Sequence, residues 1–147
     1  MKVLIIEQEK TFQQSLQLFM ERYKNCEVFL ASSRREGMFL FQTFPFDMVL
    51  CGDRLPEGDS LEMLKEWMTQ NPKLISILMT VRKDDLLEQE ATKAGIKGYL
   101  EKPFDLKQLE EAMGISDFGM HLPAPPSVGT GAGRQGLGNQ TKKGGEK

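Results

Sequence analysis

The stretch Asp47-Met-Val-Leu-Cys-Gly-Asp-Arg-Leu-Pro56 decides the fold of this chain. From Met48 to Cys51 it is a short, continuous apolar run, which is typical of a strand buried on both faces. The run ends at Gly52, and Asp53 and a proline-containing loop follow it. Buried strands of this kind occupy parallel sheets that are covered by helices on both faces, so we expect helical segments before and after it.

On both sides of this strand, apolar runs alternate with helical patterns along the chain. Four further strands are expected at residues 3–6, 28–31, 74–79 and 96–100. Apolar residues at three- and four-residue spacing predict a helix over roughly residues 9–23. Further helices are expected to begin near Ser33, Asp59, Lys83 and Asp105. This alternation predicts an α/β fold with a doubly wound, five-stranded parallel sheet.

Composition limits the classes of function. The 147 residues carry a net charge of −2, with 39% hydrophobic and 27% charged residues, which is an ordinary globular composition without the basic surface that binds nucleic acid. Residues 1–114 contain the alternating pattern, whereas residues 115–147 are rich in glycine and proline and are expected to form a disordered tail. No apolar run is long enough for a signal peptide or a membrane span, so we expect a cytoplasmic protein.

The carboxyl ends of the expected strands are the positions at which a site should be sought. Ligands of doubly wound folds bind outside these ends, where the strand order reverses. In this chain the strand ends hold Glu7-Gln8-Glu9, Gly52-Asp53, Thr80 and Glu101-Lys102. Carboxylates, a hydroxyl and an ammonium are therefore expected to gather at one edge of the sheet.

In their order and spacing, these residues resemble the receiver domain of bacterial response regulators, which accepts a phosphoryl group on an aspartate. The resemblance covers residues 2–114. Besides the stretch from Asp47 to Pro56, it rests on Asp59-Ser60-Leu61-Glu62, Leu78-Met79-Thr80, Ala94-Gly95, Gly98-Tyr99-Leu100 and Lys102-Pro103-Phe104. It implies flavodoxin-like topology with strand order 2-1-3-4-5, and a phosphoryl-accepting pocket at the strand ends.

The resemblance also shows where this chain departs from the family. The acceptor aspartate of the family lies four residues before the proline, and that position is Gly52. The acidic pair that holds Mg²⁺ has become Glu7-Gln8, and a neutral amide is a poor ligand for this cation. Thr80 and Lys102 match the hydroxyl and the cation that contact the phosphoryl group. We expect a degenerate pocket that consists of Glu7, Gln8, Gly52, Asp53, Thr80 and Lys102 and holds no cofactor.

The leading interpretation is a pseudo-receiver: a signalling module of two-component systems that binds proteins without ordinary aspartate phosphorylation and is not an enzyme. We expect Glu7 and Lys102 to form an ion pair in place of the network of aspartate, Mg²⁺ and phosphate. A histidine kinase, another regulator or an output protein would be the partner. The resemblance places partner binding or homodimerisation on the face of the fourth helix, fifth strand and fifth helix, with Tyr99, Leu87 and Ile96 as candidates.

Two alternatives stay open. In the first, Asp53 accepts the phosphoryl group, Glu7 and Glu9 help to hold Mg²⁺, and the protein is a stand-alone phosphorelay receiver. Because strand side chains alternate, Asp53 is expected to face away from the side of Gly52, unless a bulge at the glycine re-aims it. The remote alternative is a flavodoxin-like cofactor-binding protein, although Glu7-Gln8-Glu9 lacks the glycines and hydroxyls that cradle phosphate.

Overall fold

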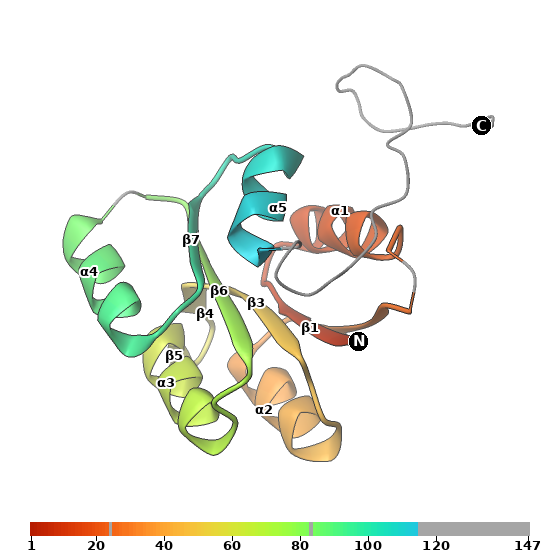
Figure 1. Ribbon diagram of the computed structural model, residues 1–147, viewed down its shortest axis with the longest axis horizontal. Helices are drawn as coiled ribbons and strands as arrows, with labels where there is room; N and C mark the ends of the chain where they lie inside the picture. Colours follow the sequence, from red (N-terminus) through yellow and green to blue (C-terminus); the bar gives the residue numbers. More distant parts are fainter. Residues whose placement is uncertain (24, 83, 115–147) are drawn as a thin grey trace.

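The sheet has the predicted topology. The computed structural model describes residues 1–23, 25–82 and 84–114 (Figure 1). Five parallel strands form one sheet: β1 (Lys2–Ile6), β2 (Glu27–Ala31), β3 (Met48–Gly52), β6 (Ile75–Thr80) and β7 (Gly98–Glu101). Their order across the sheet is β2-β1-β3-β6-β7. Strands β4 and β5 form a separate small sheet, so β6 and β7 are the fourth and fifth strands of the main sheet, and the order matches the predicted 2-1-3-4-5. The expected tail, residues 115–147, lies outside the described residues.

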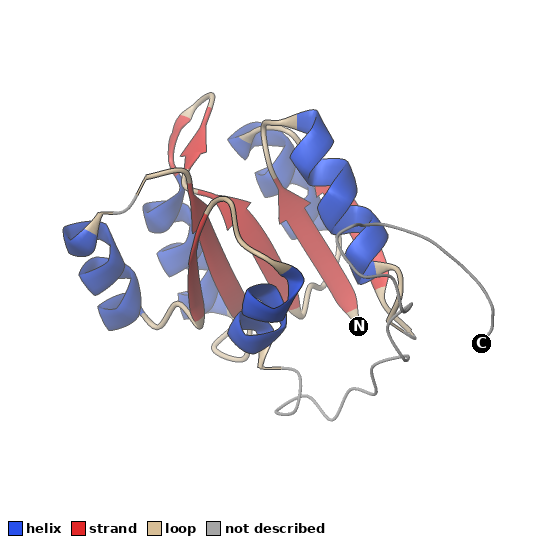
Figure 2. Cartoon of the chain, turned by 90° about the horizontal axis from the view of Figure 1, so that it is seen from above, coloured by secondary structure: helices blue, strands red, loops and turns tan. Residues whose placement is uncertain are grey.

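Five helices connect the strands and cover both faces of the sheet. They are α1 (Lys10–Met20), α2 (Arg34–Thr43), α3 (Ser60–Gln70), α4 (Asp85–Ala94) and α5 (Leu106–Met113). Helices α2, α3 and α4 lie on one face, and α1 and α5 lie on the other (Figures 1 and 2). None of the helices in the described residues is long and apolar enough to cross a membrane. Because the two faces of the sheet are covered by different helices, the strand ends are flanked by α2, α3 and α4 on one face and by α1 and α5 on the other.

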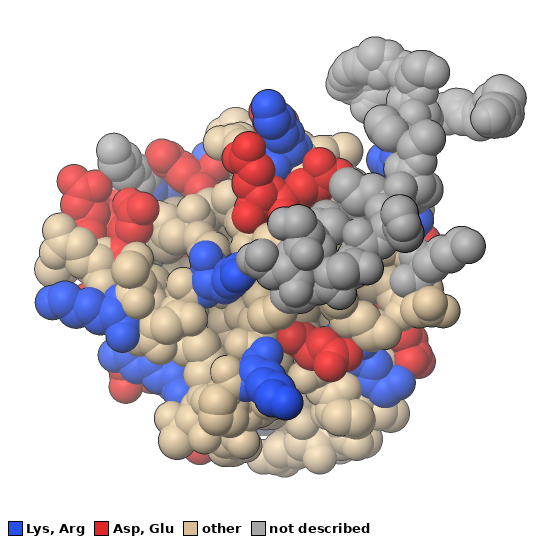
Figure 3. Space-filling view, in the orientation of Figure 1, with Lys and Arg blue, Asp and Glu red and all other residues tan. Residues whose placement is uncertain are grey.

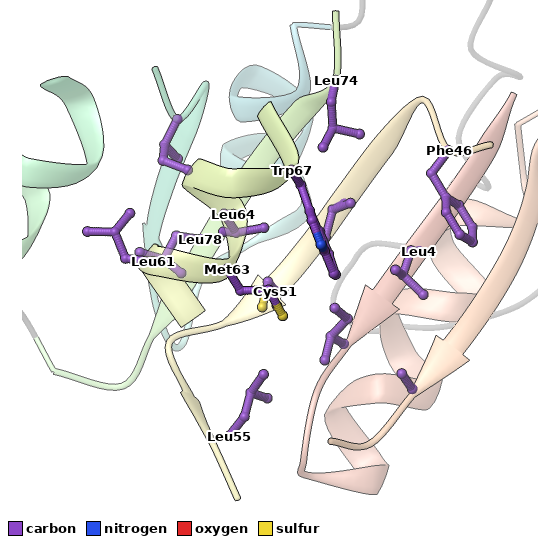
Figure 4. Packing of buried hydrophobic residues seen from close by; sticks show 14 of the residues in the cluster. Leu4, Phe46, Cys51, Leu55, Leu61, Met63, Leu64, Trp67, Leu74 and Leu78 are labelled. Atoms are coloured by element: carbon purple, nitrogen blue, oxygen red, sulfur yellow. The ribbon is translucent and has the colours of Figure 1, made fainter. Parts of the chain in front are cut away.

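Alternate side chains of the strands enter two separate cores. The core under α2, α3 and α4 receives Leu4, Ile6, Val49, Cys51 and Leu78. The core under α1 and α5 receives Val3, Ile5, Met48, Leu50, Ile77 and Met79. Figure 4 shows the first core, in which Trp67 reaches from α3 toward the sheet; its ring stacks on that of Phe41 with centroids 4.0 Å apart. This alternation continues at the strand ends and decides which candidate residues can meet.

Helix boundaries follow local hydrogen bonding. The Ser33 hydroxyl accepts a hydrogen bond from the backbone N–H of Glu36 at the start of α2, as expected for a cap. Helix α1 ends at Met20 and not at residue 23 as predicted, because the chain turns there and the N–H of Tyr23 bonds to the carbonyl of Met20. The last strand begins two residues later than predicted, because Gly95 (φ 97°) ends α4 and Ile96 packs into the core.

A two-stranded hairpin follows β3 where the sequence predicts only a loop. Its strands are β4 (Arg54–Leu55) and β5 (Gly58–Asp59), and it projects beyond the carboxyl end of the sheet (Figure 2). Leu55 packs in the core with α3, which fixes the hairpin against the domain. Strands of two residues are too short to show a period-two pattern, so the sequence cannot predict them.

Candidate functional site

The strand ends divide the candidate residues into two groups on opposite sides of the sheet edge. Gly52 and Lys102 lie on the side of α1 and α5, where the side chain of Glu7 joins them. Asp53 and Thr80 lie on the side of α3 and α4, where both line a groove with Leu87 of α4. Alternation along β3 is the physical reason, because neighbouring side chains point to opposite faces. The predicted single pocket therefore consists of two adjacent clusters.

The first cluster is an ion pair between Glu7 and Lys102. The Nζ atom of Lys102 lies 2.8 Å from Oε1 of Glu7, and the two side chains are 14% and 5% exposed. The second oxygen, Oε2, accepts a hydrogen bond of 2.9 Å from the backbone N–H of Glu9. Nζ also lies 4.5 Å from the centroid of the Phe12 ring, which adds a cation–π contact. Both charges are thus compensated within the protein, and the expected ion pair is formed.

Gly52 is closely approached by the Glu7 carboxylate. A Cβ atom at Gly52 would lie 3.0 Å from Oε1 and 3.7 Å from Cδ of Glu7. The carbonyl oxygen of Gly52 accepts hydrogen bonds from the Ser60 hydroxyl and, at 3.3 Å, from the Cys51 thiol. The backbone is therefore held from the side of α3, and Glu7 occupies the space that a side chain at residue 52 would enter.

Gln13 positions this cluster and was not recognised from the sequence. Its Nε2 atom donates hydrogen bonds of 3.2 Å to the carbonyl of Glu7 and 2.8 Å to the carbonyl of Ala31. The side chain is buried in α1 and ties the ends of β1 and β2 together. The sequence does contain an indication of this role, because Gln13 is a polar residue between Phe12 and Leu16 on the buried side of an amphipathic helix. Buried polar side chains of this kind need partners.

The second cluster joins Asp53 to Thr80. The Thr80 hydroxyl donates to Oδ2 of Asp53 at 2.8 Å and accepts from the backbone N–H of Arg82 at 3.2 Å. The N–H of Asp53 bonds to the carbonyl of Met79 at 2.7 Å, so the ladder of β3 and β6 continues without a bulge. Asp53 faces away from the side of Gly52, as alternation predicts, and its partner is a hydroxyl on the same side.

A groove of about 450 Å³ lies beside the second cluster. Its lining includes Asp53, Thr80 and Leu87. The hairpin contributes further residues, among them Arg54, and Arg82 follows the end of β6. Both acidic and basic side chains therefore line this groove. Lys102 is not among its lining residues, because it is bound to Glu7 on the other side of the sheet edge.

Comparison with known proteins identifies the fold family. The family model described as response regulator receiver domain matches residues 3–114. The chain belongs to this family. It is therefore a receiver domain of two-component signalling, and the resemblance in the sequence motifs is confirmed.

Similar proteins carry the domain within longer chains. The chain is 32% identical over 112 residues to the transcriptional regulatory protein CrdR of Helicobacter pylori, which covers 74% of this chain and 51% of that protein. It is 32% identical over 110 residues to the transcriptional regulatory protein ZraR of Klebsiella oxytoca, covering 75% and 25%. The chain thus spans between about a quarter and a half of these two relatives.

Solved receiver domains superpose on most of the chain. The receiver domain protein from Clostridium thermocellum gives a TM-score of 0.69 at 29% identity and covers 77% of this chain and 90% of that one. The receiver domain of the Francisella response regulator 1452 gives 0.68 at 25% identity, covering 78% and 93%. The described domain therefore corresponds to almost a whole receiver domain.

The residues present do not fit the Mg²⁺ site that the family implies. Mg²⁺ requires several oxygen ligands in octahedral arrangement. Gly52 offers no side chain, Gln8 is exposed and neutral, and both oxygens of Glu7 already have partners. Across residues 1–23, 25–82 and 84–114, no group of three or more His, Cys, Asp or Glu side chains is arranged to hold a metal ion.

The three candidates for the interaction face differ in exposure. Tyr99 is half-buried, and its hydroxyl lies 3.5 Å from the carbonyl oxygen of Asp84. Burial, and then the negative charges of Asp53 and Asp84, raise the pKa of the Tyr99 hydroxyl. Leu87 is partly buried against the core, whereas Ile96 is 8% exposed and lies within it. In this conformation Tyr99 and Leu87 are accessible to a partner, and the side chain of Ile96 is not.

Proposed function

We propose that this receiver domain is a pseudo-receiver: a protein-interaction module of two-component signalling that acts without ordinary aspartate phosphorylation. The observation that carries the proposal is the position of the Glu7 carboxylate, which approaches Gly52 and is bound to Lys102. A phosphoryl group needs a carboxylate nucleophile and a free cation to stabilise its developing charge. At this strand end the nucleophile is missing and the cation is already neutralised.

The ion pair substitutes for a ligand. In a phosphorylated receiver the lysine faces an anion that comes and goes, whereas Lys102 faces an anion that belongs to the chain. The conformation of the strand end would then be held without a phosphoryl group and would change only on partner binding. A partner shifts such a domain only by binding one conformation better than another. We propose a histidine kinase, another regulator or an output protein as this partner, in the cytoplasm.

The test is an attempt to phosphorylate the protein. Purified protein is incubated with Mg²⁺ and acetyl phosphate, and in parallel with Mg²⁺ and beryllofluoride, beside a receiver domain that is known to react. We expect no adduct of roughly 80 Da by intact mass and no Mg²⁺-dependent amide shifts at the strand ends. An adduct on the wild-type chain that disappears in the Asp53→Asn variant would overturn the proposal.

The contact between Asp53 and Thr80 favours a second candidate. A carboxylate 2.8 Å from this hydroxyl has one of the neighbours that a phosphoacceptor needs, so Asp53 is the residue to test in a stand-alone phosphorelay receiver. Two observations stand against it: Lys102 lies on the other side of the sheet edge, and both oxygens of Glu7 already have partners, one of which is the positively charged Lys102. This candidate requires Mg²⁺ binding that is lost in Asp53→Asn, and a metal titration distinguishes the two.

A further inference from the structure

The outward face of α2 carries a groove of about 400 Å³ that is separate from the strand ends. Its lining consists of Arg34, Arg35, Met38, Phe39 and Gln42 of α2, with Glu57 from the tip of the hairpin. The five residues of α2 are spaced by three, four or one along the helix, so they form two adjacent rows on one face. We call this surface the α2 groove.

The centre of the α2 groove is apolar and open to solvent. Phe39 is 64% exposed and Met38 is 36% exposed, although both belong to a helix whose opposite side packs on the sheet. Single exposed apolar residues are common, but two large ones in the same hollow form the kind of surface that binds another protein. Aromatic and methionine side chains are also enriched at protein interfaces.

The charges around this centre favour an acidic partner. Within the part of the chain that the structure describes, neither Arg34 nor Arg35 forms an ion pair, and Nε of Arg34 is buried without a hydrogen-bond partner. Glu57, the one carboxylate among the described residues that line the groove, is already engaged, because its Oε1 accepts from the backbone N–H of Arg34 at 2.9 Å. Guanidinium groups that have no carboxylate partner can bind one from another protein with two parallel hydrogen bonds.

Acidic side chains are also favoured by the position of these arginines on the helix. Arg34 and Arg35 are the first two residues of α2, where the partial positive charge of the helix attracts anions. No residue of the parallel sheet lines the groove, so an extended peptide would find no strand edge to pair with. A helix that lays an apolar row along α2 fits this surface better. Acidic and basic side chains are mixed over the face that Figure 3 shows.

We propose that the α2 groove docks an amphipathic acidic helix of a partner protein. One or two large apolar side chains of that helix would cover Met38 and Phe39, and its carboxylates would pair with Arg34 and Arg35. The surface lies apart from Tyr99 and Leu87, and the inference goes beyond the proposed function because it does not depend on phosphorylation at the strand ends. Phosphorylation of the protein would therefore leave this inference intact.

The test uses a defined peptide and the full chain. A fluorescein-labelled, amphipathic 18-residue peptide with Leu on one face and Glu on its flanks is titrated with protein and followed by anisotropy. We expect binding that weakens with added salt and amide shifts confined to α2 and the hairpin. Replacing Glu by Lys in the peptide, or making Phe39→Ser or Arg35→Glu in the protein, should each weaken binding by about tenfold. The matched control is Leu18→Ser on α1, which removes an apolar residue that is 68% exposed elsewhere.

Three results would overturn the proposal. The first is shift mapping on the wild-type chain that places the peptide outside α2 and the hairpin, a result that does not depend on any variant folding. The second is equal affinity for the Glu and Lys peptides, or for wild type and Phe39→Ser. The third is concentration-dependent self-association in sedimentation experiments that Phe39→Ser abolishes, which would show that a second copy of the chain occupies the groove.

Discussion

Replacing Glu7 by Gln tests the ion pair that defines the strand end. The substitution preserves the shape of the side chain, removes its negative charge and places an NH₂ group in place of the oxygen that faces Lys102. The amide oxygen can still accept the hydrogen bond from the backbone N–H of Glu9. What is lost is the compensation of an ammonium group whose side chain is only 14% exposed.

The magnitude follows from the burial of the pair. Removing one partner of a buried ion pair costs about 3–5 kcal/mol, because the remaining charge is left uncompensated. The cation–π contact of Lys102 with Phe12 is present in both proteins and does not contribute to the difference. Because the Lys102 side chain is still 14% exposed and water solvates part of the unpaired charge, we expect Glu7→Gln to lower the free energy of unfolding by about 2–4 kcal/mol. This is a large part of the 5–15 kcal/mol that is typical of a domain.

The assay is urea unfolding at pH 7 of four proteins: wild type, Glu7→Gln, Lys102→Met and the double variant. With a denaturant slope of about 2 kcal/mol per M, the single variants should shift the midpoint by about 1–2 M. The double variant should be destabilised by less than the sum of the singles, because no unpaired charge remains. Glu9→Gln is the matched control: its side chain is exposed, and we expect a change of less than about 0.5 kcal/mol.

The reasoning is refuted if Glu7→Gln unfolds within about 0.5 kcal/mol of the wild type, or if the effects of the two single variants add. Either result would mean that the two side chains do not depend on one another. Measurements in low and high salt separate this case from a surface pair, since screening weakens exposed pairs far more than buried ones.

Two further predictions concern close packing and thiol reactivity. A Cβ at Gly98 would lie 2.7 Å from Cβ of Ala112, so Gly98→Ala should force β7 and α5 apart and lower stability by about 1–3 kcal/mol in thermal unfolding. A Cβ at Gly37 would lie 2.6 Å from Cδ1 and 3.1 Å from Cγ1 of Ile6, whereas the contact at Gly98 also includes backbone atoms of Ala112 at 3.3 Å. The Ile6 side chain can shift more easily than this backbone, and Ala raises helix propensity, so Gly37→Ala should destabilise the protein less than Gly98→Ala; equal losses in the two variants would contradict this reasoning. Burial raises the pKa of the Cys51 thiol to about 12, so this thiol should react with Ellman's reagent only after unfolding, and rapid labelling of it in native protein would show that the core opens.

Much of the fold could be predicted from local patterns. The apolar runs and the helical spacing predict the five strands, the five helices and their order along the chain. Strands that are buried on both faces are continuously apolar, and helices that are buried on one face have apolar residues at three- and four-residue spacing. The cap at Ser33 and the stop at Gly95 are local as well, since each depends on one side chain or one backbone angle. The β4–β5 hairpin could not be predicted, because Leu55 holds it in place through a contact with the core.

The amino-acid pattern alone predicts a receiver fold, with Gly52 where the acceptor is expected and with a carboxylate and a lysine at the strand ends. How these groups pair depends on the three-dimensional arrangement of the strands. Glu7 and Lys102 are 95 residues apart, and they meet because β1 and β7 end on the same side of the sheet edge, beside Phe12 of α1. Asp53 meets Thr80 because β3 and β6 are neighbours and both side chains share the other side. The sequence shows which polar and charged side chains stand at the strand ends, but strand order and side-chain alternation decide which of them contact one another.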